Sequence, residues 1–239
     1  MISVCMATYN GAEYIRAQVG SILGQISNDD ELIISDDSSM DGTPGIIEQL
    51  GDNRIRLFRD NHFQSPVLNF EHALKQASGE TIFLSDQDDL WAPNKVHVMT
   101  EILKTCDLAV SDCDVIDASG RQTHPSFYAK RHSGPGLFKN IYKNTYLGCC
   151  MAFRAEVLDW ALPFPKDVPM HDMWLGTIAE MFGKTRFCPD VLVHYRRHCK
   201  NASSTYDPSP YSVFQKMQFR LVLIQRLFER YRQRKAAVQ

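Results

Sequence analysis

The sequence predicts an α/β protein with a mostly parallel central sheet and helices on both faces. Over roughly the first 115 residues, short apolar segments of strand length alternate with segments whose apolar residues recur at helical spacing. Such alternation is typical of βαβ units, whose right-handed crossovers place helices on both faces of the sheet. We predict strands at 2–7, 31–35, 54–58, 81–84 and 108–111, and helices at 15–23, 43–50, 67–77 and 94–104.

The first helix illustrates the pattern, because Ile15, Val19 and Ile22 fall on one helical face. The second half of the chain is less regular. We expect a long loop at 120–136, a strand at 147–154, a connector at 163–169, a helix at 172–182, a strand at 191–195, a mobile Ser/Pro-rich segment at 201–210 and a terminal helix at 211–235.

Composition excludes several classes of protein. The 239 residues are 44% hydrophobic and 23% charged, with a net charge of −2, so a disordered chain or a strongly basic nucleic-acid-binding protein is not expected. No apolar run reaches the roughly 20 residues that a bilayer span needs. Strand-like sequence follows Met1 directly, so we expect no signal peptide, and the seven cysteines contain no C-x-x-C pair. Free thiols and a cytoplasmic location are the simplest expectation.

The terminal helix carries a concentrated positive charge. Residues 216–235 include seven basic side chains and one acid, a local charge of 7 − 1 = +6, which leaves the remainder at −2 − 6 = −8. A basic amphipathic helix of this kind contacts a membrane surface or a partner. Two interpretations remain open at this point: residues 211–235 touch the inner face of the plasma membrane, or the helix packs on the domain with a solvated basic face.

Polar residues follow three of the predicted strands. In open α/β sheets ligands bind beyond the carboxyl ends of the strands, so these positions are candidates for a binding site. The three clusters are Thr8-Tyr9-Asn10, Asp36-Asp37 and Asp86-Gln87-Asp88-Asp89.

The third cluster predicts a metal site. Three carboxylates in four residues repel one another unless a cation neutralises them. Mg²⁺ is commonly held by one or two carboxylates together with substrate phosphates. The alternative is a helix cap, but one aspartate suffices for that, so we favour a metal–diphosphate site.

Other candidates allow two interpretations each. An aspartate at 36–37 could accept a hydrogen bond from the N3–H of uracil or thymine, while Asp41 or Thr43 could merely cap a helix. Asp172 lies at the start of a predicted helix. There it could act as a general base, or it could only stabilise the helix through a favourable interaction with the positive end of the helix dipole. His198 follows a strand and could be structural or a metal ligand.

Taken together, these residues resemble the family 2 glycosyltransferases, which have the GT-A fold. The matching pieces are ATYNG (7–11), ISDDSSMDGT (34–43), FLSDQDDLWAPNK (83–95), LGCCMAFR (147–154), HDMWL (171–175) and YRRHCKN (195–201). The SDQDD run and the HDMWL and YRRH pieces look most like bacterial rhamnosyltransferases. The resemblance implies a GT-A domain at 1–205, with a nucleotide-sugar half (1–115) and an acceptor half (116–205), followed by the basic helix region at 206–239.

The resemblance also implies roles for individual residues. The catalytic base would be Asp172, and the metal, Mg²⁺ or Mn²⁺, would be held by Asp88 and His198. Nucleotide-sugar binding would involve Thr8, Tyr9, Asn10, Asp36, Asp37, Asp86 and Gln87, and the donor-sugar or acceptor side Trp91, Lys95, Gly148, Cys149 and His171.

The implied reaction transfers a sugar, with inversion, from a nucleoside diphosphate to a saccharide or lipid-linked saccharide acceptor in cell-surface polysaccharide synthesis. The donor would be dTDP-rhamnose or a UDP-sugar, with no nucleic-acid partner. Two alternatives stay open: a nucleotidyltransferase or other phosphate-transfer enzyme that uses clustered aspartates and a metal, and a non-catalytic sugar-nucleotide-binding module.

Overall fold

The central element is a nine-stranded sheet, seen in a computed structural model that describes residues 1–199, 201 and 211–237. The predicted mobile segment at 201–210 therefore lies outside the described residues apart from Asn201. The strands are β1 (Ile2–Thr8), β2 (Glu31–Asp36), β3 (Ile55–Phe58), β4 (Thr81–Ser85), β5 (Leu90–Trp91), β6 (Leu108–Ile116), β7 (Gln122–His124), β8 (Met151–Arg154) and β9 (Thr185–Arg196). Their order is β3-β2-β1-β4-β8-β6-β9-β5, and β7 pairs with β6.

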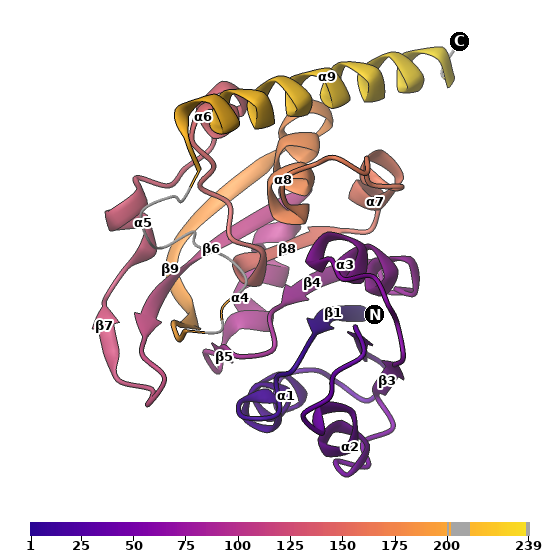
Figure 1. Ribbon diagram of the computed structural model, residues 1–239, viewed down its shortest axis with the longest axis vertical. Helices are drawn as coiled ribbons and strands as arrows, with labels where there is room; N and C mark the ends of the chain where they lie inside the picture. The colour runs from indigo at the N-terminus through magenta and orange to yellow at the C-terminus, as the bar shows by residue number, and fades with distance from the viewer. Residues whose placement is uncertain (200, 202–210, 238–239) are drawn as a thin grey trace.

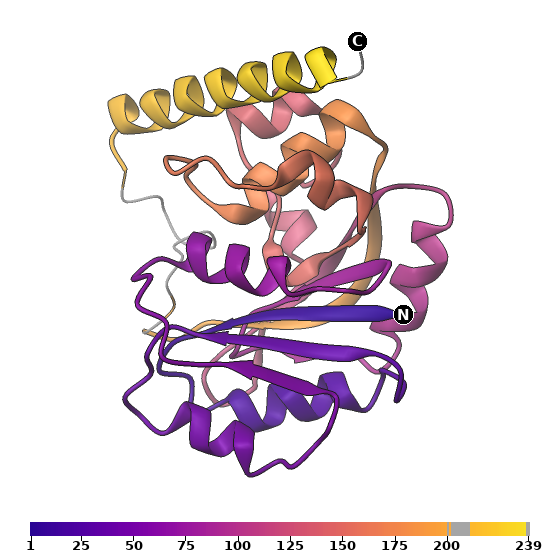
Figure 2. The same ribbon diagram turned by 90° about the vertical axis from the view of Figure 1, so that its right-hand side faces the viewer.

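Helices cover both faces of this sheet (Figures 1 and 2). On one face lie α1 (Ile15–Leu23) and α2 (Thr43–Glu48), and on the other lie α3 (Pro66–Lys75) and α8 (His171–Phe182). The remaining helices are α4 (Lys95–Leu103), α5 (Phe127–Arg131), α6 (Leu137–Tyr142), α7 (Glu156–Ala161) and α9 (Val213–Ala237), with a 3₁₀ turn at Gly148–Cys150.

The first half of the chain folds as the apolar periodicity predicts. β1 pairs in parallel with β2 and β4, and β2 pairs in parallel with β3. Every residue of β2 is buried, as expected for a strand covered on both faces. The mostly parallel α/β sheet with helices on both faces is confirmed, and β8 enters it antiparallel between β4 and β6.

The second half departs from the prediction in several places. The expected long loop at 120–136 contains β7 and α5. The sequence does not reveal β7 because all its residues are exposed and show no alternation, and α5 is short, capped by the Ser126 hydroxyl and anchored by buried Phe127. The strand expected from residue 147 begins only at Met151, since residues 148–150 form a 3₁₀ turn. The strands expected at 108–111 and 191–195 are parts of the longer β6 and β9.

The register of the parallel strands positions the site. Thr8 lies beside Asp36 across β1 and β2, and Met6 lies beside Ser85 across β1 and β4. The carboxyl ends of these strands therefore meet at one edge of the sheet, and the residues that follow them face the same space.

Candidate active site

A cavity of about 590 Å³ opens at the carboxyl ends of β1, β2 and β4. Asp88, which follows β4, and Asp172, at the start of α8, both line it, although they come from opposite halves of the chain. Its other described lining residues are Ala7, Thr8, Tyr9, Asp37, Gln64, Ser65, Pro66, Asn69, Phe70, Asp86, Gln87, Leu147, Gly148, Met170, His171, Tyr195 and Asn201.

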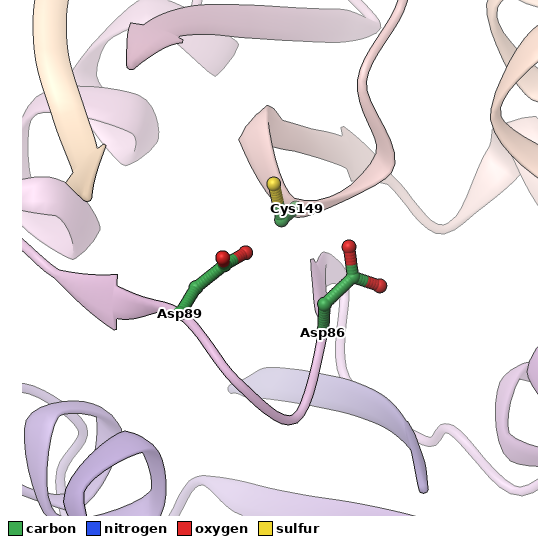
Figure 3. A group of neighbouring side chains, drawn as sticks. All are labelled: Asp86, Asp89 and Cys149. Atoms are coloured by element: carbon green, nitrogen blue, oxygen red, sulfur yellow. The ribbon is translucent and has the colours of Figure 1, made fainter. Parts of the chain in front are cut away.

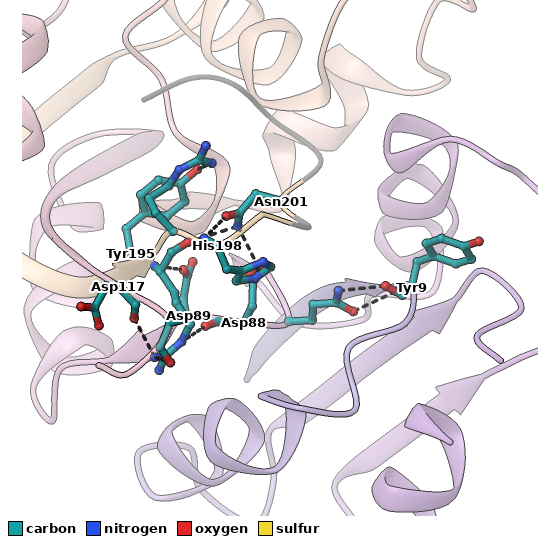
Figure 4. A network of polar contacts seen from close by, with 11 residues as sticks. Tyr9, Asp88, Asp89, Asp117, Tyr195, His198 and Asn201 are labelled. Carbon is teal, nitrogen blue, oxygen red and sulfur yellow. Dashed lines mark hydrogen bonds and ion pairs between the residues drawn. The ribbon is translucent and has the colours of Figure 1, made fainter. Parts of the chain in front are cut away.

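At one end of the cavity the side chain of Gln87 holds the loop after β1. The Tyr9 main-chain N–H donates to Gln87 Oε1 at 2.8 Å, and Gln87 Nε2 donates to the Tyr9 carbonyl at 3.0 Å (Figure 4). A Cβ on Gly11 would clash with the same Gln87 amide, so a larger residue there would displace the Gln87 side chain from this position. The clamp fixes the backbone of Tyr9 and leaves its ring largely exposed beside the cavity.

The aspartate doublet at the end of β2 divides into a position that lines the cavity and a position that is buried in the fold. Asp37 lines the cavity, and its Oδ1 accepts the Phe63 main-chain N–H at 2.6 Å. Asp36 is fully buried, accepts the Thr8 hydroxyl at 2.7 Å and is not among the described lining residues. Asn10 does not line the cavity either, because its Oδ1 accepts the Met40 N–H at 2.8 Å.

The acidic loop after β4 is attached to the end of β9. Asp89 Oδ1 accepts the Arg196 main-chain N–H, and Arg196 Nε donates to the Asp88 carbonyl, both at 2.8 Å. Asp88 Oδ2 lies 2.8 Å from His198 Nε2 and accepts Asn201 Nδ2 at 3.0 Å (Figure 4). The structure thus brings together the two residues predicted to hold a metal.

A second acidic group lies behind the first. Ligand atoms of Asp86, Asp89 and Cys149 lie within 4.8 Å of one another (Figure 3). Burial raises the pKa of Asp86 to about 8, and the charges of Asp88 and Asp172 act in the same direction. Of the three residues only Asp86 lines the cavity, and a thiol is a poor ligand for Mg²⁺ or Mn²⁺. Asp86 and Asp88 both line the cavity, but the raised pKa of Asp86 disfavours its anionic form, so Asp88 is the better candidate for an ion that a ligand in the cavity shares.

The start of α8 contributes a carboxylate and an imidazole. Burial raises the pKa of Asp172 to about 6, and its Oδ1 accepts the Met173 N–H at 2.6 Å. The His171 ring stacks on Phe70 with 3.9 Å between the ring centroids, and burial lowers the pKa of His171 to about 3. Neither ring nitrogen has a hydrogen-bond partner among the described residues. A Cβ on Gly148 would lie 2.8 Å from His171 Nε2, so a larger residue would displace the ring.

Three residues predicted on the sugar side lie beneath the cavity instead. Lys95 is fully buried, donates from Nζ to the Cys149 carbonyl and sits 4.1 Å from the centroid of the Trp91 ring. Trp91, Lys95 and Cys149 are not among the described lining residues. Burial lowers the pKa of Lys95. In this structure the three side chains are buried and pack behind the residues that line the cavity.

Some lining residues were not predicted from the sequence. Gln64, Ser65, Asn69 and Phe70 come from the loop after β3 and the start of α3. The rule that ligands bind beyond strand ends applies to β3 as well, so position alone was a usable signal. Leu147, Met170, Tyr195 and Asn201 are also found on the wall.

Comparison with known proteins gives the family. The profile of Glycosyl transferase family 2 matches residues 3–160. The chain is 29% identical over 215 residues to an uncharacterised glycosyltransferase of a Nostoc species, covering 84% of this chain and 66% of the relative. It is 25% identical over 209 residues to the Escherichia coli UDP-Glc:alpha-D-GlcNAc-diphosphoundecaprenol beta-1,3-glucosyltransferase WfgD, covering 85% of this chain and 80% of the relative.

Solved structures agree on the fold. Staphylococcus aureus TarS (residues 1–349), in a crystal structure with UDP-GlcNAc, superposes with a TM-score of 0.72 at 20% identity, over 93% of this chain and 66% of that one. The predicted GT-A fold is thereby confirmed, and the chain belongs to glycosyl transferase family 2. It spans about two thirds of the length of the Nostoc relative.

Proposed function

We propose that this protein is an inverting, metal-dependent glycosyltransferase that moves a sugar from a nucleoside diphosphate to an acceptor hydroxyl. The observation that carries this proposal is that Asp88 and Asp172 line one cavity. In this proposal Asp88 holds the donor diphosphate through the metal, and Asp172 takes the proton of the acceptor hydroxyl.

In this proposal the nucleoside of the donor binds at the end of the cavity formed by Thr8, Tyr9 and Asp37. The exposed Tyr9 ring offers a stacking surface for a base, and Asp37 offers a carboxylate oxygen for the N3–H of uracil or thymine. The donor is then a UDP-sugar or dTDP-rhamnose. The similarity to WfgD, which uses UDP-glucose, supports a UDP-sugar as the donor.

The metal is assigned to Asp88 and His198. Asp88 Oδ2 and His198 Nε2 lie 2.8 Å apart, so both side chains would be available to hold one ion. A bound Mg²⁺ or Mn²⁺ would supply Lewis-acid stabilisation of the leaving diphosphate. The chain itself contributes the anionic ligand and, through Asn201, the hydrogen bond that orients it.

Asp172 is assigned as the base. A weakly nucleophilic hydroxyl needs a carboxylate within hydrogen-bond reach to take its proton during transfer. A pKa of about 6 leaves Asp172 mostly ionised at neutral pH, yet more basic than an ordinary aspartate. One base and a single displacement invert the anomeric carbon.

The acceptor is proposed to be a saccharide or lipid-linked saccharide of cell-surface polysaccharide synthesis, met at the cytoplasmic face of the membrane. The acceptor class is supported by the similarity to WfgD, whose acceptor is alpha-D-GlcNAc-diphosphoundecaprenol. The domain limits also remain proposals: a GT-A domain at 1–205, with its nucleotide-sugar half at 1–115 and acceptor half at 116–205, and the basic helix region at 206–239.

The test is a donor panel of UDP-sugars and dTDP-rhamnose, with Mn²⁺ and a synthetic GlcNAc-diphosphate lipid as acceptor. The proposal expects release of nucleoside diphosphate together with a glycosylated lipid. A nucleotidyltransferase would instead leave the sugar nucleotides untransferred and, in a parallel reaction with a nucleoside triphosphate and a sugar 1-phosphate, release pyrophosphate. Binding of a sugar nucleotide without turnover in either reaction would indicate a binding module. The matched control is the same assay with EDTA in place of Mn²⁺.

A further inference from the structure

The terminal helix α9 has an outer apolar stripe that is largely exposed, although Tyr231 at its end stacks on Phe182 of α8. Its members recur at alternating spacings of three and four residues, and their exposed fractions run from 48% to 71%. A stripe of this kind is normally buried against a partner. The outer stripe consists of Phe214, Met217, Leu221, Ile224, Phe228 and Tyr231.

A different side of α9 attaches the helix to the protein. Leu223 and Leu227 are buried there. Arg226 pairs with Asp167 at 2.8 Å, and Arg230 NH1 donates to the carbonyl of Leu162, also at 2.8 Å. Packing on the domain, one of the two interpretations of the sequence, is therefore observed, and it fixes the direction in which the outer stripe points.

The outer stripe continues onto α6. Figures 1 and 2 show α9 lying across one end of the molecule, and α6 and α9 are in contact. Phe138 and Tyr142 of α6 are 85% and 70% exposed. The guanidinium of Arg220 lies 4.6 Å from the centroid of the Tyr142 ring and donates to its carbonyl, which joins the two helices. We call the outer stripe together with Phe138 and Tyr142 the apolar end surface.

Positive charge accompanies the apolar end surface. Exposed cationic side chains include Lys139 on α6, Lys143 directly after it, and Arg232 and Lys235 on α9. Within the described helix α9 the only acid is Glu229, which is paired with Arg226 at 2.7 Å. The surface therefore offers apolar contact area together with unneutralised cations.

We propose that the apolar end surface docks on an anionic phospholipid membrane, with α9 lying in the plane of the interface. Apolar side chains would enter the headgroup–acyl boundary while neighbouring lysines and arginines meet lipid phosphates. A second copy of the chain fits less well, because two such helices would bring together two clusters of like charge. No helix in the described part of the chain is long and apolar enough to cross a bilayer.

This inference deepens the proposed function, since it would hold the active site near a lipid-linked acceptor, but vesicle binding can be measured without any donor or acceptor. The full chain is sedimented with vesicles of pure phosphatidylcholine and with vesicles in which about a third of the lipid is phosphatidylglycerol. Binding is expected to the anionic vesicles, to weaken in high salt because charges are screened, and to be at least about 10-fold weaker on phosphatidylcholine.

Two matched variants locate the contact. The double variant Phe214→Ser/Phe228→Ser removes two exposed rings and is expected to weaken vesicle binding by at least about 10-fold, since each buried phenyl ring contributes more than about 1.5 kcal/mol, roughly a factor of 10. Gln218→Ser/Gln233→Ser changes two exposed residues of the same helix outside the stripe and should leave binding unchanged. Unchanged melting temperatures would show that both variants are folded.

Several results would overturn the inference. These are absent binding to anionic vesicles, equal loss of binding in both double variants, or a concentration-dependent dimer that Phe214→Ser/Phe228→Ser abolishes. Nucleotide binding, measured in parallel by calorimetry with UDP and Mn²⁺, separates the two proposals. Vesicle binding without nucleotide binding would contradict only the proposed function, and nucleotide binding without vesicle binding would contradict only the membrane surface.

Discussion

His198 Nε2 lies 2.8 Å from Asp88 Oδ2, although 110 positions separate the two residues in the chain. The imidazole is held from its other side by the Tyr14 ring, which stacks on it with 5.1 Å between centroids. Two segments distant in sequence, the loop after β4 and the segment after β9, are thereby joined at the edge of the cavity. This contact joins the two residues that we propose as ligands of a divalent cation.

Replacing either partner should weaken metal-dependent nucleotide binding. Asp88→Asn removes the anionic ligand, and we expect the affinity for UDP in Mn²⁺ to fall by at least about 10-fold, with a smaller loss for His198→Ala. Isothermal titration calorimetry with Mn²⁺ and with EDTA measures this. Asp60→Asn, a change at an exposed aspartate, is the control. If Asp88→Asn bound UDP as tightly as the parent protein in Mn²⁺, the metal assignment would be wrong.

The base assignment predicts a loss of turnover without a loss of binding. Asp172→Asn should lower kcat by about 10²–10⁴-fold while donor affinity stays within a few fold. Because burial raises the pKa of Asp172 to about 6, the kcat of the parent protein should rise with pH through about 6, as the carboxylate ionises. Steady-state kinetics between pH 5 and pH 8 tests both points; a variant with near-normal kcat would exclude the role.

The same pKa predicts an effect on stability. The folded protein binds a proton at Asp172 more tightly than the unfolded chain, whose aspartate titrates near 3.8. The free energy of unfolding therefore falls as pH rises between about 4 and 6. Above about pH 6 the full cost of ionising buried Asp172 has been incurred and stability no longer changes from this cause. Asp172→Asn should relieve it and stabilise the protein by about 1–3 kcal/mol at pH 8 but not at pH 4. Urea denaturation at the two pH values measures this, and an equal effect at both would contradict it.

Replacing His171 with an apolar ring should also stabilise the protein, for a different reason. Both ring nitrogens are buried without a described partner, which costs free energy that an apolar ring would not incur. His171→Phe keeps the stack on Phe70, and we expect the melting temperature to rise by about 2–4 °C for a gain of about 1 kcal/mol. Differential scanning calorimetry checks this, with Phe70→Leu as the variant that should lose the stack and melt lower. A fall in the melting temperature of His171→Phe would show that the imidazole nitrogens form hydrogen bonds in solution, and it would contradict the prediction.

Gln87 is expected to support nucleotide binding by holding the main chain of Tyr9 in place. Gln87→Ala removes both hydrogen bonds to the Tyr9 main chain, so the loop after β1 loses its fixed position. We expect UDP affinity to fall by about 3–10-fold, the range for one neutral hydrogen bond of about 0.5–1.5 kcal/mol. Tyr9→Ala should cause a similar loss, and the double variant should be little worse than either single one. Additive losses would mean that Gln87 acts independently of Tyr9.

Much of the first half could be predicted because its strands are buried on both faces and its helices are amphipathic. That periodicity places Tyr9, Asp37 and Asp88 at one sheet edge without any coordinates. The sequence could not show that Lys95 is buried, because a lysine next to a site is usually solvated. In the structure its Nζ donates instead to the buried Cys149 carbonyl. Nor could it separate Asp36 from Asp37, which differ only in which face of the strand end each side chain meets.

The central claim, a single displacement assisted by Asp172 with the donor held at Asp88, is tested most directly by the anomeric configuration of the first product. NMR spectroscopy of the product formed from a UDP-α-sugar, before any equilibration, reads this configuration. The account predicts a β-linked product and release of UDP. An α-linked product would mean that configuration is retained, which a single back-side displacement cannot give, and it would contradict the account.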